Sequence, residues 1–202
     1  MAFFRDYFDD ISTRIGGDVD PVELERLSEL FRAVRSRRRK VILVGNGGSA
    51  AMASHVAVDL TKTAGVRAVN FTNADLLTCL ANDYGYPLWV EKALEFYSDP
   101  GDAVVLISSS GRSLNILNGA TAARRYGLHV VTFSGFDADN PLRSIGELNF
   151  WVNSHSYNTV EMAHHVWLLA AVDRLAREKE SRDWVHISAS SLLETRDISA
   201  RS

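Results

Sequence analysis

The sequence predicts an α/β protein, a three-layer sandwich in which helices flank a five-stranded parallel sheet, with further helices at the N-terminus. From residue 40 onward, short apolar runs rich in β-branched residues alternate with longer segments of helical periodicity. The runs are nearly continuous in apolar character, as is typical of parallel strands buried on both faces. We expect one domain over residues 1–180, made of N-terminal helices at 1–39 and an α/β core at 40–180, followed by a tail at 181–202.

The N-terminal region is predicted to form two helices. Apolar side chains recur at helical spacing through the first turns and give an aromatic stripe, formed by Phe4, Tyr7, Phe8 and Ile11. Such a stripe packs either against a partner subunit or on the chain's own core, and the sequence leaves both open. After Gly16-Gly17, Asp20-Pro21 begins a second helix, because proline suits the first turn.

The core elements follow in alternation. Strands are expected in KVILVGN (40–46), VRAVNFT (66–72), DAVVLISSS (102–110), HVVTFSG (129–135) and LNFWVNS (148–154). Helices are expected at about 49–64, 75–97, 113–126 and 157–179. The tail is rich in Ser and Arg, so we expect a partly ordered terminus with Trp184 docked on the body. Trp89, Trp151 and Trp167 are expected to be packing anchors.

Composition and charge exclude some functions. The net charge of −3 and the pI near 6.1 give no footprint of a nucleic-acid-binding protein. A local basic run, Arg35, Arg37, Arg38, Arg39 and Lys40, is interpreted as solvating the C-terminal end of a helix rather than as a binding patch. The single cysteine, Cys79, allows no intrachain disulfide and is expected in the core. No apolar run approaches the roughly 20 residues of a membrane span, so we expect a soluble, cytoplasmic protein.

Two polar turns are predicted at the carboxyl ends of strands. Gly45-Asn46-Gly47-Gly48-Ser49 opens a helix, whose free N–H groups favour an anionic or polyhydroxylated ligand, although a plain turn remains an alternative. The turn lacks the Gly-Lys-Ser/Thr of a Walker A motif and the last glycine of a GxGxxG motif. The second turn is SSSGRS, and its hydroxyls and amides can surround a phosphate, the candidates being Ser108, Ser109, Ser110 and Ser113. Ser113 is alternatively an N-cap.

Two polar pairs at helical spacing, His55 with Asp59 and Glu161 with His165, complete the candidate site. Residues four apart share a helix face, so each pair can converge on one point. One interpretation is a zinc site with all four as ligands. In the other, Asp59 and Glu161 act as acid and base without metal, and His165 tunes one of them. We favour zinc, because two such pairs are a fuller ligand set than acid/base chemistry requires.

Five motifs, in order, carry a family resemblance: GNGGSAAMASHVAVDL, CLANDYGY, LISSSGRSLNIL, VVTFSG and VEMAHHVWLL. Over about residues 20–178 the chain resembles the SIS (sugar isomerase) domain family, in its phosphoheptose isomerase branch. The resemblance implies a flavodoxin-like fold. It also implies interconversion of sedoheptulose 7-phosphate and D-glycero-D-manno-heptose 7-phosphate by a homotetramer with active sites between subunits, often with zinc.

The resemblance also implies residue roles. Ser108, Ser110 and Ser113 would hold the phosphate, Asn46, Gly47 and Ser49 would contact the sugar, and Asn82 and Asp83 would lie near its hydroxyls. The chain departs from the family pattern at three positions: Asp59 replaces a glutamate, Glu161 a glutamine and Leu169 the catalytic histidine.

Leucine cannot shuttle a proton, so His165, one turn before Leu169 on the same face, is the candidate replacement. His164 lies about 100° round the helix, so it could face a neighbouring subunit or the opposite side, or move protons beside a metal. We weigh an interface or core histidine as the alternative for both.

The catalytic candidates are therefore Asp59, Glu161 and His165. The first hypothesis is a metal-assisted aldose-ketose isomerase of a seven-carbon sugar phosphate. A second is a non-catalytic SIS protein that binds a phosphosugar or a replication-initiator partner, for which the loss of the usual histidine at Leu169 would be the mark. A third is an isomerase of another phosphosugar.

Overall fold

A five-stranded, fully parallel sheet forms the centre of the protein. In this computed structural model, the backbone is described for residues 2–199 and the side chains for residues 2–178. The strands are β1 (Val41–Gly45), β2 (Ala68–Asn70), β3 (Ala103–Ser108), β4 (His129–Ser134) and β5 (Leu148–Trp151). Their order is β2-β1-β3-β4-β5, the flavodoxin-like order. All five predicted strands are confirmed.

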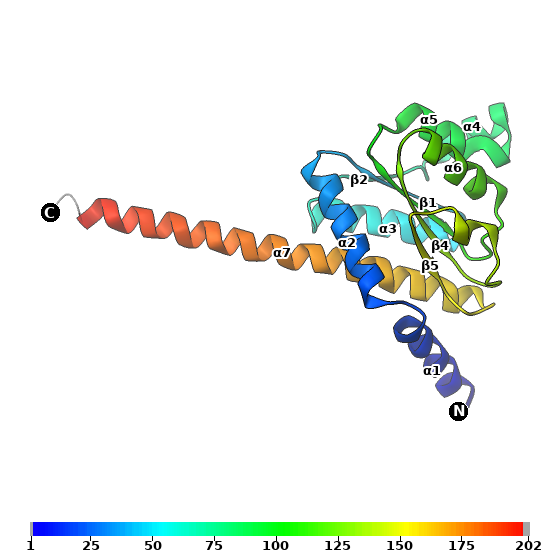
Figure 1. The fold of residues 1–202 in the computed structure, drawn as a ribbon, viewed down its shortest axis with the longest axis horizontal. Coiled ribbons are helices and arrows are strands. Elements are labelled where there is room, and N and C mark those ends of the chain that lie inside the picture. Colours follow the sequence, from blue (N-terminus) through cyan, green and yellow to red (C-terminus); the bar gives the residue numbers. More distant parts are fainter. Residues whose placement is uncertain (1, 200–202) are drawn as a thin grey trace.

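Helices cover both faces of the sheet and confirm the three-layer prediction (Figure 1). They are α1 (Ala2–Gly17), α2 (Pro21–Ser36), α3 (Gly48–Lys62), α4 (Ala74–Tyr84), α5 (Trp89–Tyr97), α6 (Leu114–Arg125) and α7 (Tyr157–Ser199). Two short 3-10 helices, η1 (Tyr86–Leu88) and η2 (Pro141–Ser144), lie in connections. Among the residues whose structure is described, no helix has the length and apolar character needed to cross a membrane.

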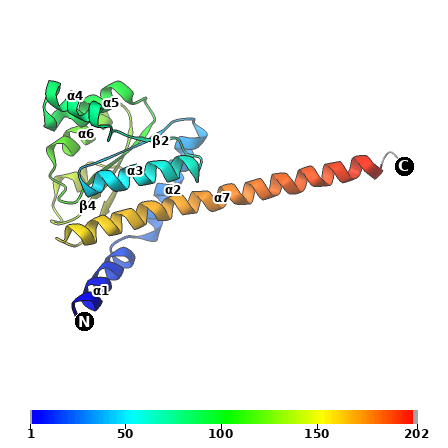
Figure 2. The ribbon, with the colours of Figure 1, turned by 180° about the vertical axis from the view of Figure 1, so that it is seen from behind.

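Alternate side chains of the strands build two separate cores, as period-two geometry requires. Val41, Leu43 and Val105 face a core completed by α2, α3 and α7. Ile42, Val104 and Leu106 face the core of α4, α5 and α6. Seen from behind, α3 and α7 lie side by side across the first of these faces (Figure 2). Because α3 and α7 touch, the polar residues on these two helices can meet.

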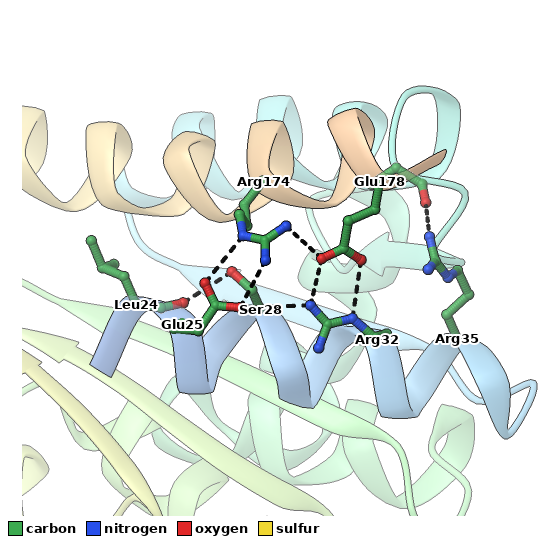
Figure 3. A network of polar contacts seen from close by, with 8 residues as sticks. Leu24, Glu25, Ser28, Arg32, Arg35, Arg174 and Glu178 are labelled. Carbon is green, nitrogen blue, oxygen red and sulfur yellow. Dashed lines mark hydrogen bonds and ion pairs between the residues drawn. The ribbon is translucent and has the colours of Figure 1, made fainter. Parts of the chain in front are cut away.

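Charged side chains join α2 to α7 (Figure 3). Asp20 caps α2 by accepting from the Val22 backbone N–H, with proline in the first turn as predicted. Further along, Arg32 makes a bidentate contact with Glu178, at 2.6 and 3.0 Å. Arg174 binds the same carboxylate at 2.6 Å and also reaches Glu25 at 3.1 Å. These pairs fix α2 against α7, the helix that carries Glu161 and His165.

Several sequence predictions are corrected. The predicted helix at 75–97 is interrupted by Gly85, whose φ of +85° ends α4 and starts η1. Cys79 is exposed on α4 rather than in the core. The expected helix end near 179 is wrong, because α7 continues to Ser199 through a segment without Gly or Pro.

The tryptophan predictions are confirmed where the side chains are described. Trp89 and Trp167 are buried, each at 1% exposure. The Trp151 ring packs under the Arg143 guanidinium at 4.4 Å. The predicted docking of Trp184 lies outside the described side chains.

Candidate active site

A cavity of about 260 Å³ opens at the carboxyl ends of β1 and β3. These neighbouring strands are paired in register up to Gly45 and Ile107, and their connections leave in opposite directions, which makes this the switch point where doubly wound sheets bind ligands. Three segments supply the lining: the glycine-rich turn (residues 45–49), the serine-rich turn (residues 108–113) and the first turns of α7. The lining residues are Asn46, Gly47, Gly48, Ser49, Ile107, Ser108, Ser109, Ser110, Ser113, Tyr157 and Glu161.

The glycine-rich turn is compact and holds Asn46 at the cavity wall. A Cβ on Gly45 would come within 2.6 Å of the Ser49 Cβ, so only glycine fits where the chain reverses into α3. Asn46 exchanges two amide hydrogen bonds with the buried Asn115, at 2.9 and 3.1 Å. The hydroxyl of Tyr86 donates to the Asn46 Oδ1 at 2.9 Å. The amide is therefore held in one orientation at the cavity wall.

The serine-rich turn forms the adjoining wall of the cavity. The Gly111 N–H donates to the Ser108 carbonyl at 2.8 Å, with a φ of +63° that glycine adopts readily. The Ser108 hydroxyl donates to the Ser113 hydroxyl at 3.1 Å. Ser113 precedes α6 but makes no side-chain cap, so the N-cap alternative does not account for its hydroxyl. The turn combines hydroxyls with the start of a helix, which suits a phosphate.

Buried Asn140 supports this turn from below. A Cβ on Gly111 would meet the Asn140 Oδ1 at 2.0 Å, so the two residues are in direct contact. The Asn140 amide donates to the Gly135 carbonyl at 3.1 Å and to the Asp137 carbonyl at 2.8 Å. Through Asn140, the loop after β4 thereby holds the serine-rich turn in position.

The Glu161 carboxylate faces the cavity and presses against the start of α3. A Cβ on Gly48 would lie 2.2 Å from the Glu161 Oε2. Burial of the side chain raises the pKa of Glu161 above its ordinary value. A half-buried carboxylate with a raised pKa beside a polar cavity is suited to proton transfer.

His55, Asp59 and His165 form a contiguous set between α3 and α7, and none of the three is among the residues that line the cavity. The His55 Nδ1 lies 3.0 Å from the His165 Nε2, and the His55 Nε2 lies 3.2 Å from the Asp59 carboxylate. Burial, and then the neighbouring His55, lower the pKa of His165, while Asp59 acts in the opposite direction. His165 is therefore neutral near pH 7.

The arrangement as it stands does not form a metal site. Both ring nitrogens of His55 are engaged, one with His165 and one with Asp59, so the three side chains face one another rather than a common point. Among the described residues, no group of three or more His, Cys, Asp or Glu side chains is placed to hold a metal ion. The donor atoms are of the kinds zinc prefers, but their geometry does not fit it here.

Most predicted site residues meet, and a few do not. The candidates from both turns and Glu161 line one cavity, and Asp59 and His165 meet through His55. Asn82 and Asp83 lie exposed at the end of α4, outside the cavity lining, so their sugar contacts stay a prediction.

Two positions of α7 face the protein interior, one fully buried and one partly buried. His164 is fully buried, with its Nε2 2.9 Å from the Ser134 carbonyl oxygen, which fits the core alternative. Leu169 packs against the core of α2, α3 and α7.

Sequence reasoning missed Asn115, Tyr86 and Asn140, which orient Asn46 and support the serine-rich turn. Tyr86 and Asn115 lie within the motifs CLANDYGY and LISSSGRSLNIL, but no local pattern predicts these contacts, because each residue acts on one far away in the chain. Gly48 appeared only as part of the turn, and its contact with Glu161 links two segments more than a hundred residues apart.

The fold and the cavity together define a doubly wound α/β protein whose site combines an anion-binding turn with an acidic side chain. The SIS domain model matches residues 6–135, more than half of the chain. The chain belongs to the SIS domain family, and its relatives place it with the phosphoheptose isomerases, which confirms the resemblance seen in the sequence.

Three relatives illustrate the similarity. A probable phosphoheptose isomerase from Thermoplasma acidophilum is 35% identical over 145 residues, 68% of this chain and 79% of the relative. A phosphoheptose isomerase from Syntrophotalea carbinolica is 31% identical over 176 residues, 84% of this chain and 88% of the relative. The solved phosphoheptose isomerase GmhA from Neisseria gonorrhoeae superposes with a TM-score of 0.76 at 26% identity, covering 86% of this chain and 96% of that one.

Proposed function

We propose that the protein is an aldose-ketose isomerase that converts sedoheptulose 7-phosphate to D-glycero-D-manno-heptose 7-phosphate. The single observation that carries the proposal is the position of Glu161, a half-buried carboxylate in the same cavity as the serine-rich turn. The phosphate would lie in the serine-rich turn, with Ser108, Ser110 and Ser113 as donors. Asn46 and Ser49 would contact sugar hydroxyls. Relatives of more than 30% identity named phosphoheptose isomerase support this choice of substrate.

The chemistry requires two protons to move. In the ketose, the proton on C1 must reach C2 through an enediol, and the proton on O1 must reach O2. We assign the first transfer to Glu161, whose carboxylate takes the proton from C1 and returns it to C2. We assign the second to His165, which lies one turn further along the same face of α7.

The three-residue set explains how His165 can do this. In neutral rings, the His55 Nε2–H donates to Asp59, and the His165 Nε2–H donates to the His55 Nδ1. This pattern leaves the His165 Nδ1 with a free lone pair, able to accept the O1 proton and pass it to O2. Asp59 therefore acts through His55, as the orienting acid does in a catalytic triad.

The decisive experiment incubates the purified protein with sedoheptulose 7-phosphate and follows the aldose by NMR. Glu161→Gln should reduce turnover by at least about a thousandfold while leaving the far-UV spectrum unchanged. Glu29→Gln is the matched control, because Glu29 is exposed on α2. Saturable binding without turnover in the wild-type protein would favour the non-catalytic phosphosugar-binding alternative. Full activity of Glu161→Gln would overturn the assigned site.

Zinc is a separate proposal that rests on donor chemistry alone. To bind with His55, Asp59, Glu161 and His165 as ligands, it would have to break the contact between His55 and His165. Elemental analysis of the purified wild-type protein and His55→Ala tests this. Stoichiometric zinc that is lost in the variant supports the metal, and an equal metal content in both proteins contradicts the ligand set.

We also propose a homotetramer with active sites at subunit interfaces. Helix α1 has no buried residue, and Phe3, Phe4 and Phe8 are each more than 60% exposed. On α7, Met162 and Val166 are also exposed. Burying such an apolar surface between copies of the chain would remove it from water, which is the main driving force of association.

A further inference from the structure

A second polar cavity, of about 410 Å³, lies at the amino ends of β1 and β2, whereas the candidate active site lies at the carboxyl ends of the strands. Its lining comes from the ends of α2 and α3 and from the residues that precede β1 and β2. The lining residues are Arg35, Arg38, Arg39, Gly65 and Arg67. Four arginines therefore line one cavity, and each guanidinium group carries five N–H donors.

The hydrogen bonds of these arginines use few of those donors. Arg35 donates to the Ala64 carbonyl at 2.8 Å, and Arg67 donates to the Arg38 carbonyl. Among the side chains that the structure describes, no carboxylate lies within ion-pair distance of any of the four. Asp99 and Glu178 are close enough to these arginines to interact electrostatically, but each is hydrogen-bonded to another cation, Asp99 to Lys40 and Glu178 to Arg32.

Capping of helix ends does not account for this much charge. The C-terminal ends of α2 and α3 meet here, and each end is equivalent to about half a negative charge. One or two arginines would balance both ends, whereas four are present. The remaining positive charges repel one another at one cavity, which costs stability unless an anion separates them.

The backbone conformation at Arg38 also supports an anion-binding role for the cavity. Arg38 follows α2 with a φ of +58°, and the Arg39 N–H bonds back to the Val34 carbonyl, as in a helix end that normally uses glycine. A side chain in this left-handed conformation costs about 1 kcal/mol relative to glycine. An arginine at this position sacrifices stability and adds charge to the cavity wall.

We propose that this cavity is a binding site for a multiply charged phosphate anion, such as a pyrophosphate group. Arginine pairs with phosphate oxygens through two parallel N–H contacts, and four arginines suit an anion with several charged oxygens. The site is separate from the serine-rich turn, so it would bind its ligand independently of the sugar phosphate.

Calorimetric titration with inorganic pyrophosphate at about 0.15 M salt tests the proposal. The titrated protein is Ser110→Ala/Ser113→Ala, in which the phosphate site of the serine-rich turn is weakened. We expect saturable binding of one pyrophosphate per chain. Adding Arg38→Gly should weaken it about tenfold, because a charge-assisted contact is lost while glycine fits the local φ.

Arg124→Gln on the same background is the control, because it removes one exposed positive charge at the end of α6. It should change the affinity less than about twofold, since an exposed distant charge is screened. A second variant, Arg67→Gln, should weaken binding as Arg38→Gly does. Absence of saturable binding, or an equal loss in Arg38→Gly and Arg124→Gln, would overturn the site.

Discussion

The carboxylate of Glu161 on α7 lies directly against Gly48, the first residue of α3, so closely that a methyl group on Gly48 would overlap its Oε2 at 2.2 Å. Gly48 is therefore the residue that makes room for the proposed base. The contact also joins the glycine-rich turn to α7, and it sets where the acidic group stands relative to the serine-rich turn.

Gly48→Ala should displace Glu161 and lower kcat by at least about a hundredfold, because a misplacement of about 1 Å already costs that much. The φ of Gly48 is not in the left-handed region, so alanine is compatible with the helix and the fold should survive. The measurement is turnover of sedoheptulose 7-phosphate, together with the Tm. Gly16→Ala is the control, because nothing lies within 4 Å of a Cβ there. Unchanged kcat in Gly48→Ala would contradict the assigned position of Glu161.

Ser110→Ala/Ser113→Ala should weaken the binding of a sugar phosphate by about tenfold or more, since two donors to a charged group are lost. The Tm should change little, because Ser113 makes no cap and Ser110 is only partly buried. Binding of sedoheptulose 7-phosphate is measured by calorimetry, with Ser144→Ala on η2 as the control. If affinity is retained while the Tm falls, the hydroxyls are structural rather than phosphate donors.

Phe4→Ser/Phe8→Ser should shift the protein from a tetramer toward smaller species, because these side chains are 65% and 61% exposed in the single chain. Light scattering after gel filtration gives the mass directly. Val22→Ser on α2 removes another exposed apolar side chain, at 62% exposure, and should leave the mass unchanged. A wild-type monomer would refute the proposed assembly.

His164 predicts how stability depends on pH. Complete burial lowers the pKa of His164 from 6.5 to about 4, and its Nδ1 has no hydrogen-bond partner among the described residues. Between pH 6.5 and 4 the unfolded chain binds the proton and the folded chain does not, so the free energy of unfolding falls as the pH falls, by up to about 3 kcal/mol.

His164→Gln should remove this loss, because glutamine keeps a donor for the Ser134 carbonyl and does not titrate. Urea unfolding at pH 7.5 and pH 5 compares the variant with the wild type. His155→Gln, at an exposed position, should retain the pH dependence of the wild type. If His164→Gln is destabilised by acid as strongly as the wild type, another group is responsible.

The sequence by itself determined the architecture. Continuous apolar strands such as Val41–Gly45 and Ala103–Ser108 cannot be exposed on either face, so their alternation with helices requires a covered parallel sheet. Both polar turns were also visible, because glycine and serine clusters at strand ends are local signals. The family followed from the same motifs.

Only the tertiary structure decided which of these residues meet. Glu161 against Gly48, His165 beside His55, and Asn140 beneath Gly111 are contacts between segments distant in the chain, which no periodicity encodes. The same holds for Cys79 and His164, where burial depended on how the helices pack rather than on local hydrophobicity. Local propensity fixes the elements, whereas the position of a side chain at a site depends on close packing of the whole core.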